Sequence, residues 1–264
     1  MMGRLEIELK KKKDAGQKIL VPFVTGMWPD ADSFAAILHA LQRGGADAIE
    51  VGIPFSDPAA DGPVIQRSSQ LALERGATLR GIFAAVKKAR EEGLTVPLLY
   101  MTYFNPVFNL GAENFALEAA RSGADGVLVV DLPPEEAGEF APMVRKEGLD
   151  TVFLVAPTTP ERRMRKVLAE CGGFVYCVSV AGVTGEKKPV TELVSETVGK
   201  VRPITGLPVL VGFGVSTPEA ASSIARISDG VIIGSALIDK IGDARGAEAA
   251  RRAFEFVSSV KKAL

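Results

Sequence analysis

One acidic residue is notable for the kind of strand on which it lies. In ADAIEVGI (46–53), strand alternation places Glu50 with two small residues on one face, opposite three bulky apolar residues. An ionised carboxylate on a buried face is costly unless it is paired, and burial raises its pKa. A carboxyl with a raised pKa both donates and accepts a proton near neutral pH. A structural Glu paired with a buried Lys or Arg is the alternative, but no strand segment obviously supplies that partner, so acid–base chemistry is favoured.

Two more acids follow in the loop PFSDPAADGP (54–63), at Asp57 and Asp61. The prolines stiffen this loop, and Asp57 before Pro58 favours a turn. Both acids would either flank a substrate together with Glu50 or form turn hydrogen bonds. Their spacing alone does not decide between these roles.

Glycines at the ends of three later apolar runs predict a phosphate site. They occur in VTG (183–185), GFG (212–214) and GS (234–235). Glycine lets the backbone approach a ligand closely, and the free N–H groups at a helix start bind anions. The alternative is a set of plain turns, but two glycine-terminated strands at the expected places favour phosphate.

Other chemistries are disfavoured by what the chain lacks. The eight apolar runs contain no Lys, which a Schiff-base aldolase would need. The single His, His39, lies in a helical stretch and excludes a His-rich metal site, so no metal is expected. Cys171 and Cys177 have five residues between them, a spacing that predicts two buried thiols rather than a redox or zinc motif. The remaining possibility is acid–base chemistry on a phosphorylated small molecule, without metal or cofactor.

The elements that must position these residues form a regular pattern. Eight short β-branched runs without strict alternation are typical of strands buried on both faces; they cover 19–25, 48–53, 96–103, 126–131, 151–156, 174–180, 209–214 and 231–235. Helical spacing lies between them, at 33–43, 113–121, 135–146, 160–170 and 189–201.

Helix starts are predicted at Asp32 or Ser33, at Thr159 before Pro160, and at Thr217 before Pro218. This strand–helix repetition predicts an α/β fold, a single (β/α)₈ TIM barrel over residues 1–264, with residues 1–16 as an extra N-terminal capping helix. A doubly wound parallel sheet is the alternative. In such a barrel, active sites lie where strands end and the following loops begin.

Charge and hydropathy exclude several classes of protein. The 264 residues carry 31 basic and 32 acidic side chains, a balance that argues against a nucleic-acid binder. No apolar run approaches the 18 residues typical of a membrane span, and the N-terminus lacks the apolar core of a secretory signal. A cytoplasmic location is therefore expected, with neither nucleic acid nor membrane as a partner.

Several motifs together resemble one enzyme family along essentially the whole chain. The most specific is EVGIPFSDPAADGPVIQ (50–66), supported by PFVTG (22–26), LLYMTYFNPVFNLG (98–111), GVLVVDLPPEE (126–136), SVAGVTG (179–185), GFGVSTPE (212–219) and IIGSALI (232–238). With these motifs the chain resembles the α subunits of tryptophan synthase.

The resemblance implies a reaction in L-tryptophan biosynthesis, the retro-aldol cleavage of indole-3-glycerol phosphate to indole and glyceraldehyde 3-phosphate. Glu50 matches the family's general acid and base. Asp61 matches the carboxylate that accepts a hydrogen bond from the indole N–H, which leaves Asp57 as a turn residue. Tyr176 matches a tyrosine beside the catalytic Glu, although an ordinary core aromatic is the alternative.

The resemblance also assigns the walls of the substrate site. The phosphate cradle matches Gly185, Gly214, Gly234 and Ser235. The apolar positions around the indole match Phe23, Met101, Leu128, Leu154 and Phe213, which by composition would equally be plain core. The loops 55–62 and 180–189 match a lid, in which Thr184 would hydrogen-bond Asp61 on closure and exclude water.

The family works with a tryptophan synthase β subunit in an α2β2 heterotetramer. That β subunit carries pyridoxal phosphate and receives indole through a tunnel, so no cofactor is expected on this chain. The loop after the second strand and YFNPVFNLG (103–111) would face it. A stand-alone indole-glycerol-phosphate lyase and a non-catalytic activating partner are the alternatives. Intact Glu50, Asp61 and phosphate glycines argue against the second.

Overall fold

The parallel strands pair with one another around a closed ring. The structure is a computed structural model, and it describes residues 2–178, 190–212 and 214–264. Within this part the strands are β1 Ile19–Thr25, β2 Ile49–Gly52, β3 Leu98–Thr102, β4 Gly126–Val129, β5 Asp150–Thr151, β6 Phe153–Val155, β7 Val175–Val178, β8 Val209–Gly212 and β9 Gly230–Ile233. Their order in the sheet is β5-β4-β3-β2-β1-β9-β8-β7-β6.

The two ends of this sheet are consecutive in the chain. Only Val152 separates β5, which pairs with β4, from β6, which pairs with β7. The Val152 N–H donates to the Val127 carbonyl at 2.9 Å, so β5 and β6 together act as one interrupted strand. The sheet therefore closes as an eight-stranded barrel, which confirms the predicted TIM barrel and rules out the doubly wound alternative.

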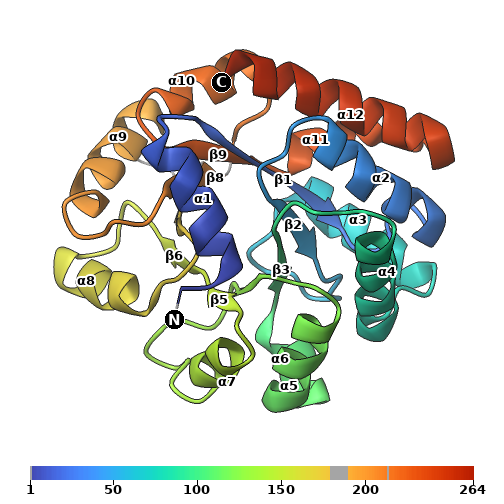
Figure 1. The fold of residues 1–264 in the computed structure, drawn as a ribbon, viewed down its shortest axis with the longest axis horizontal. Coiled ribbons are helices and arrows are strands. Elements are labelled where there is room, and N and C mark those ends of the chain that lie inside the picture. Colours follow the sequence, from blue (N-terminus) through green and yellow to red (C-terminus); the bar gives the residue numbers. More distant parts are fainter. Residues whose placement is uncertain (1, 179–189, 213) are drawn as a thin grey trace.

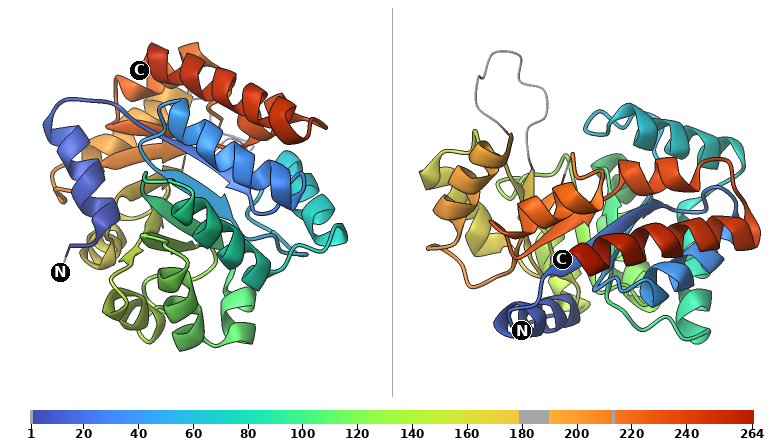
Figure 2. Two further views of the ribbon diagram at one scale, coloured as in Figure 1. Left: turned by 45° about the vertical axis from the view of Figure 1, so that its right-hand side comes forward. Right: turned by 90° about the horizontal axis from the view of Figure 1, so that it is seen from above.

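Helices surround the ring of strands (Figure 1). They are α1 Arg4–Asp14, α2 Ala31–Arg43, α3 Pro63–Glu74, α4 Leu79–Glu91, α5 Phe104–Leu110, α6 Ala112–Arg121, α7 Phe140–Lys146, α8 Glu161–Glu170, α9 Val190–Val201, α10 Pro218–Ala225, α11 Ser235–Ile241 and α12 Gly246–Ala263. In Figure 1, α1 crosses the centre of the ring, and Figure 2 shows it at the opposite end of the molecule from α3.

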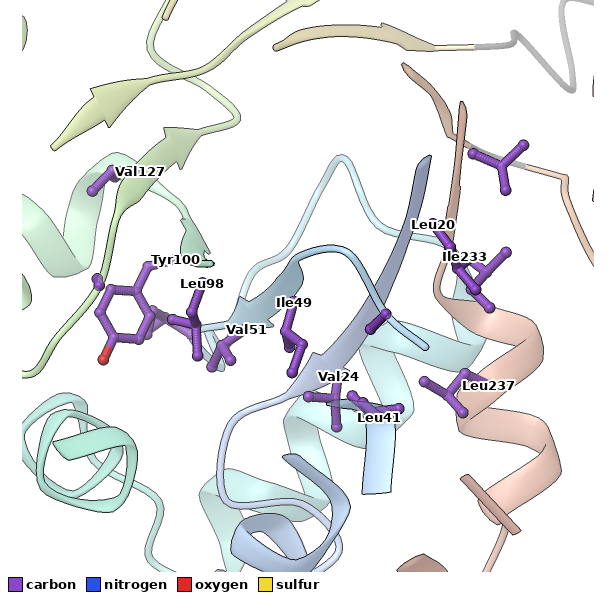
Figure 3. Packing of buried hydrophobic residues seen from close by; sticks show 14 of the residues in the cluster. Leu20, Val24, Leu41, Ile49, Val51, Leu98, Tyr100, Val127, Ile233 and Leu237 are labelled. Atoms are coloured by element: carbon purple, nitrogen blue, oxygen red, sulfur yellow. The ribbon is translucent and has the colours of Figure 1, made fainter. Parts of the chain in front are cut away.

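Strand alternation divides the core into two clusters. Residues that point outward, such as Val24, Ile49 and Val51, pack against the surrounding helices (Figure 3). Residues that point inward fill the barrel, among them Ala48 and Leu99. The parity predicted for β2 is therefore confirmed: its bulky residues face the helices, and its small residues face the interior.

Helix α1 covers the amino-terminal end of the barrel through apolar and ionic contacts. Leu5 and Leu9 are fully buried within the interior cluster. Arg4 forms an ion pair with Asp125 at 2.9 Å, and the backbone N–H groups of Gly3 and Glu6 donate to Asp150. A carboxylate at a helix N-terminus is favourable because it meets the free N–H groups there.

Two of the predicted helix starts are wrong. The α2 N-cap is Asp30, whose side chain accepts a hydrogen bond from Ser33 N–H at 2.8 Å, so the cap precedes Asp32. The cap of α8 is Pro160, because the Thr159 hydroxyl instead accepts a bond from the Ala156 N–H. Thr217 does cap α10 as predicted. The helix predicted from 135 is shorter and begins at Phe140.

Candidate active site

Glu50 lies in the interior of the barrel without a charged partner among the residues that the structure describes. It sits on β2 between Phe23 of β1 and Leu99 of β3 and is 1% exposed. Its Oε1 atom is buried without a hydrogen-bond partner in the described chain. Burial, followed by repulsion from Asp61, raises its pKa to about 8. A structural Glu would show a paired cation, so the geometry leaves this carboxyl free for proton transfer.

Asp61 enters the same cavity from the loop between β2 and α3. Its backbone N–H donates to the Pro58 carbonyl at 3.0 Å, and its carbonyl accepts from Gln66 at 2.8 Å, so local bonds fix the loop. The side chain accepts a hydrogen bond from the Tyr103 hydroxyl on Oδ2, whereas Oδ1 is buried without a partner in the described chain. Burial raises its pKa to about 6, and the bond from Tyr103 opposes this rise.

Asp57 takes no part in the cavity. Its side chain is exposed and accepts a hydrogen bond from the neighbouring Ser56 hydroxyl at 2.5 Å. The structure thus separates the two loop acids that spacing alone could not distinguish.

Tyr176 extends from β7 into the interior, across the barrel from β2. It is 5% exposed, and burial, then Glu50 and Asp61, raise the pKa of its phenol well above the ordinary value. Its hydroxyl lies over Gly212 of β8, where an added Cβ would collide with it. A glycine at this position therefore makes room for the phenol beside the two carboxyls.

The carboxyls and Tyr176 share one cavity at the carboxyl end of the strands. It is lined by Phe23, Glu50, Asp61, Gly62, Ile65, Met101, Tyr176, Gly214, Val215, Ile232, Gly234 and Ser235. Of the predicted apolar residues, Phe23 and Met101 line it. Leu128 lies in the interior cluster and Leu154 packs against that cluster, but neither lines the cavity. Thr184, Gly185 and Phe213 lie outside the described residues.

Backbone groups at one wall of the cavity suit an anion. Gly234 is the N-cap of α11 and Ser235 its first residue, so the free N–H groups of the first turn begin at this wall. Gly214 has φ +77°, a conformation that favours glycine, and lies on the same wall. Three of the four predicted phosphate residues are thus brought together.

The sequence interpretation missed several residues of the site. Tyr103 bonds to Asp61, and Ile65 and Ile232 supply apolar wall. Tyr103 stands at the carboxyl end of β3, where barrel side chains reach the active site, so its position was a usable signal. Ile65 carries no such signal because it lies on α3 and reaches the cavity only through the packing of that helix.

No cluster of three or more His, Cys, Asp or Glu side chains suited to a metal ion occurs in 2–178, 190–212 and 214–264. His39 lies 3.8 Å from Glu92 and does not line the cavity. Cys171 and Cys177 are free thiols, and burial raises the pKa of each to about 12. No helix in the described part is both long and apolar enough to span a bilayer.

A parallel (β/α)₈ barrel with two carboxyls of raised pKa facing an apolar cavity, beside a helix N-terminus, is the arrangement of a barrel enzyme suited to acid–base chemistry on a small anionic substrate. Comparison with known proteins is more specific. Residues 9–264 match the family model of the tryptophan synthase alpha chain. The chain belongs to this family, whose reaction is the lyase cleavage of indole-3-glycerol phosphate.

Individual relatives agree over the whole length. The tryptophan synthase alpha chain of Geotalea daltonii is 46% identical over 260 residues, which cover 98% of each chain. That of Laribacter hongkongensis is 46% identical over 263 residues, covering 100% of this chain and 99% of the relative. The crystal structure of tryptophan synthase subunit alpha from Legionella pneumophila superposes with a TM-score of 0.91 at 35% identity, covering 100% of this chain and 98% of that one.

Proposed function

We propose that Glu50 and Asp61 carry out the cleavage of indole-3-glycerol phosphate to indole and glyceraldehyde 3-phosphate. The observation that supports this most strongly is the pair of carboxyls in one cavity, with pKa values raised to about 8 for Glu50 and about 6 for Asp61. Near pH 7 this pair holds one proton on Glu50 and a negative charge on Asp61. These are the states that the first step of the cleavage needs, and the first step leaves Glu50 ionised for the second.

In the first step the protonated Glu50 donates its proton to indole C3. Protonation turns C3 tetrahedral and places positive charge on the ring nitrogen. Asp61 accepts a hydrogen bond from that N–H, and its free Oδ1 is the atom available for it. A carboxylate in a buried site stabilises such developing charge far more than one in water.

In the second step the Glu50 carboxylate removes the proton of the hydroxyl on the adjacent glycerol carbon. The O–H electrons form the carbonyl of glyceraldehyde 3-phosphate, the bond between that carbon and C3 breaks, and its electron pair returns to the ring to give indole. Glu50 ends protonated, ready for the next turnover. Tyr176 lies close enough to influence both carboxyls electrostatically, and we assign it to orienting Glu50 or the substrate.

The remaining walls hold the two ends of the substrate. Phe23 and Met101 contact the indole ring, with Phe213 around it, whereas Leu128 and Leu154 contribute to the packing of the barrel interior. The N–H groups at Gly185, Gly214, Gly234 and Ser235 bind the phosphate. Thr184 closes the lid by bonding to Asp61, which retains indole and excludes water.

The partner in this proposal is a tryptophan synthase β subunit in an α2β2 complex in the cytoplasm, with pyridoxal phosphate on the β subunit only. An apolar groove between the loop after β2 and α5 supports this docking face; it is lined in part by Pro54, Phe55, Asn105 and Asn109. Phe108 of α5, the same helix that carries Asn105 and Asn109, is 70% exposed, and a partner surface would cover it.

Indole release from indole-3-glycerol phosphate, measured with and without a cognate β subunit, tests the proposal. We expect slow cleavage alone and a large acceleration with the β subunit. Full activity without a partner would identify a stand-alone lyase. Acceleration of the β subunit by a chain with no cleavage of its own would identify a non-catalytic activator. Glu50→Gln should abolish cleavage while substrate still binds, and retained turnover would remove Glu50 from the mechanism.

A further inference from the structure

Tyr103 joins two neighbouring groups of the active-site loop. It follows β3 directly, is the N-cap residue of α5, and is 5% exposed. Its hydroxyl accepts a hydrogen bond from the Ala60 N–H at 3.0 Å and lies 3.1 Å from Asp61 Oδ2. Phe55 packs against its ring, with centroids 5.3 Å apart. The phenol is therefore held at its ring and at its oxygen.

These contacts determine the direction of the phenolic hydrogen. A phenol has a single O–H, and the Ala60 N–H already occupies an acceptor site on the oxygen. The O–H therefore donates to Oδ2 of Asp61, which must act as an acceptor. A carboxylate meets this requirement with either oxygen, whereas a carboxylic acid meets it with one oxygen only. The contact thus favours the ionised form of Asp61 and occupies Oδ2, which leaves Oδ1 unpartnered among the described residues.

We propose that Tyr103 is a positioning residue for the cleavage reaction: by holding Oδ2 of Asp61 and the Ala60 amide with one hydroxyl, it presents Oδ1 of Asp61 to the indole N–H. This inference rests on the proposed function of Asp61. It adds a residue at the end of β3 whose hydroxyl sets both the ionisation and the orientation of that carboxyl.

Other titratable groups surround the contact between Tyr103 and Asp61. Glu50 and Tyr176 face Asp61 from β2 and β7, and Asp131 acts on Tyr103 from the end of β4. None of these groups is a cation that would stabilise the Asp61 carboxylate. The Tyr103 hydroxyl is accordingly the side chain that lowers the pKa of Asp61, against the effect of burial.

Tyr103→Phe tests the proposal, because it removes the hydroxyl and keeps the ring against Phe55. We expect the acid limb of the pH profile of kcat/KM to move upward by about one pH unit, as expected for the loss of a hydrogen bond to a charged group. We also expect kcat to fall by about tenfold with a smaller change in KM, because Asp61 stabilises charge that develops after binding.

Tyr100→Phe is the matched control. Tyr100 lies on β3, the strand that Tyr103 follows, points away from the cavity, and bonds through its hydroxyl to Ser122 at 2.8 Å. The Tyr100→Phe variant loses a comparable buried hydrogen bond, so this exchange should lower the melting temperature without moving the acid limb of the pH profile. An equal movement of the limb in both variants would overturn the proposal, as would an unmoved limb in Tyr103→Phe.

A double-variant cycle separates this inference from a general loss of structure. On an Asp61→Asn background, Tyr103→Phe should cause much less than its tenfold loss of kcat, since its effect acts through Asp61. The same tenfold loss on both backgrounds would refute the positioning role. If the wild-type chain with its β subunit releases no indole, the proposed function fails instead, so the two failures are distinguishable.

Discussion

The exchange Glu50→Gln is expected to make the protein more stable while it abolishes cleavage. The amide has almost the shape of a protonated carboxyl and never ionises. Folding raises the pKa of Glu50 from 4.5 to about 8, chiefly through burial. Below pH 4.5 both the folded and the unfolded wild-type chain hold the proton. Between pH 4.5 and about pH 8 the unfolded chain releases this proton and the folded chain keeps it, so the free energy of unfolding of the wild type falls as the pH rises. Above about pH 8 both states have released the proton, and the free energy of unfolding falls no further.

The size of the effect follows from this interval. Each pH unit between the two pKa values is worth about 1.4 kcal/mol. Relative to their difference at pH 4, the free energy of unfolding of Glu50→Gln should therefore exceed that of the wild type by about 3 kcal/mol at pH 7 and by about 5 kcal/mol above pH 8. For a chain of this length, about 3 kcal/mol corresponds to a rise in melting temperature of about 10 °C.

Urea unfolding followed by circular dichroism at pH 4, 7 and 9 measures this difference, with indole release measured on the same samples. Glu139→Gln is the control, because Glu139 is exposed and its side chain makes no capping bond. The free energy of unfolding of Glu139→Gln should stay close to that of the wild type. A Glu50→Gln variant no more stable than the wild type at pH 9, or a difference that does not change with pH, would refute the burial argument.

Three further outcomes are expected. The pH profile of kcat/KM should be bell-shaped, with an acid limb near 6 where Asp61 is protonated and a basic limb near 8 where Glu50 ionises; a profile that is flat between pH 5 and 9 would contradict these roles. Gly52→Ala should raise KM by about tenfold in steady-state assays, because its Cβ would lie 2.5 Å from the Phe23 ring and push it into the cavity; an unchanged KM would show that the ring moves elsewhere. Asp125→Asn should lower the free energy of unfolding by about 3 kcal/mol, since it breaks ion pairs of a buried carboxylate, and a loss below 1 kcal/mol in urea titrations would contradict this.

Much of the fold was predictable because it depends on local periodicity. The apolar runs matched the strands, since strands buried on both faces need continuous apolar sequence. The division of one barrel strand into β5 and β6 was not predictable, because it depends on which neighbour each half meets. The α2 start was placed too late for a related reason: Asp30, Asp32 and Ser33 are all good caps, and only the backbone path selects Asp30.

The active site likewise has parts that the sequence predicts and parts that it does not. Alternation along β2 was enough to place Glu50 on the small, inward face, and its position beside Phe23 follows from the register of β1 and β2. The roles of Leu128 and Leu154 were less predictable. Both point into the barrel, but depth along the barrel axis decides which inward residues reach the cavity. That depth depends on the stagger between neighbouring strands, which cannot be predicted from any single segment of the sequence.

The sequence by itself determined the repetition of strands and helices, the inward face of Glu50 and the absence of lysine from the strands, since each depends on residues near one another in the chain. Residue spacing did not separate Asp61 from Asp57, and only the tertiary structure decided that Tyr103, about forty positions further along the chain, holds the Asp61 side chain. It also decided that no described cation reaches Glu50. Burial and the placement of neighbouring charges set a pKa, and both arise from contacts between segments distant in sequence.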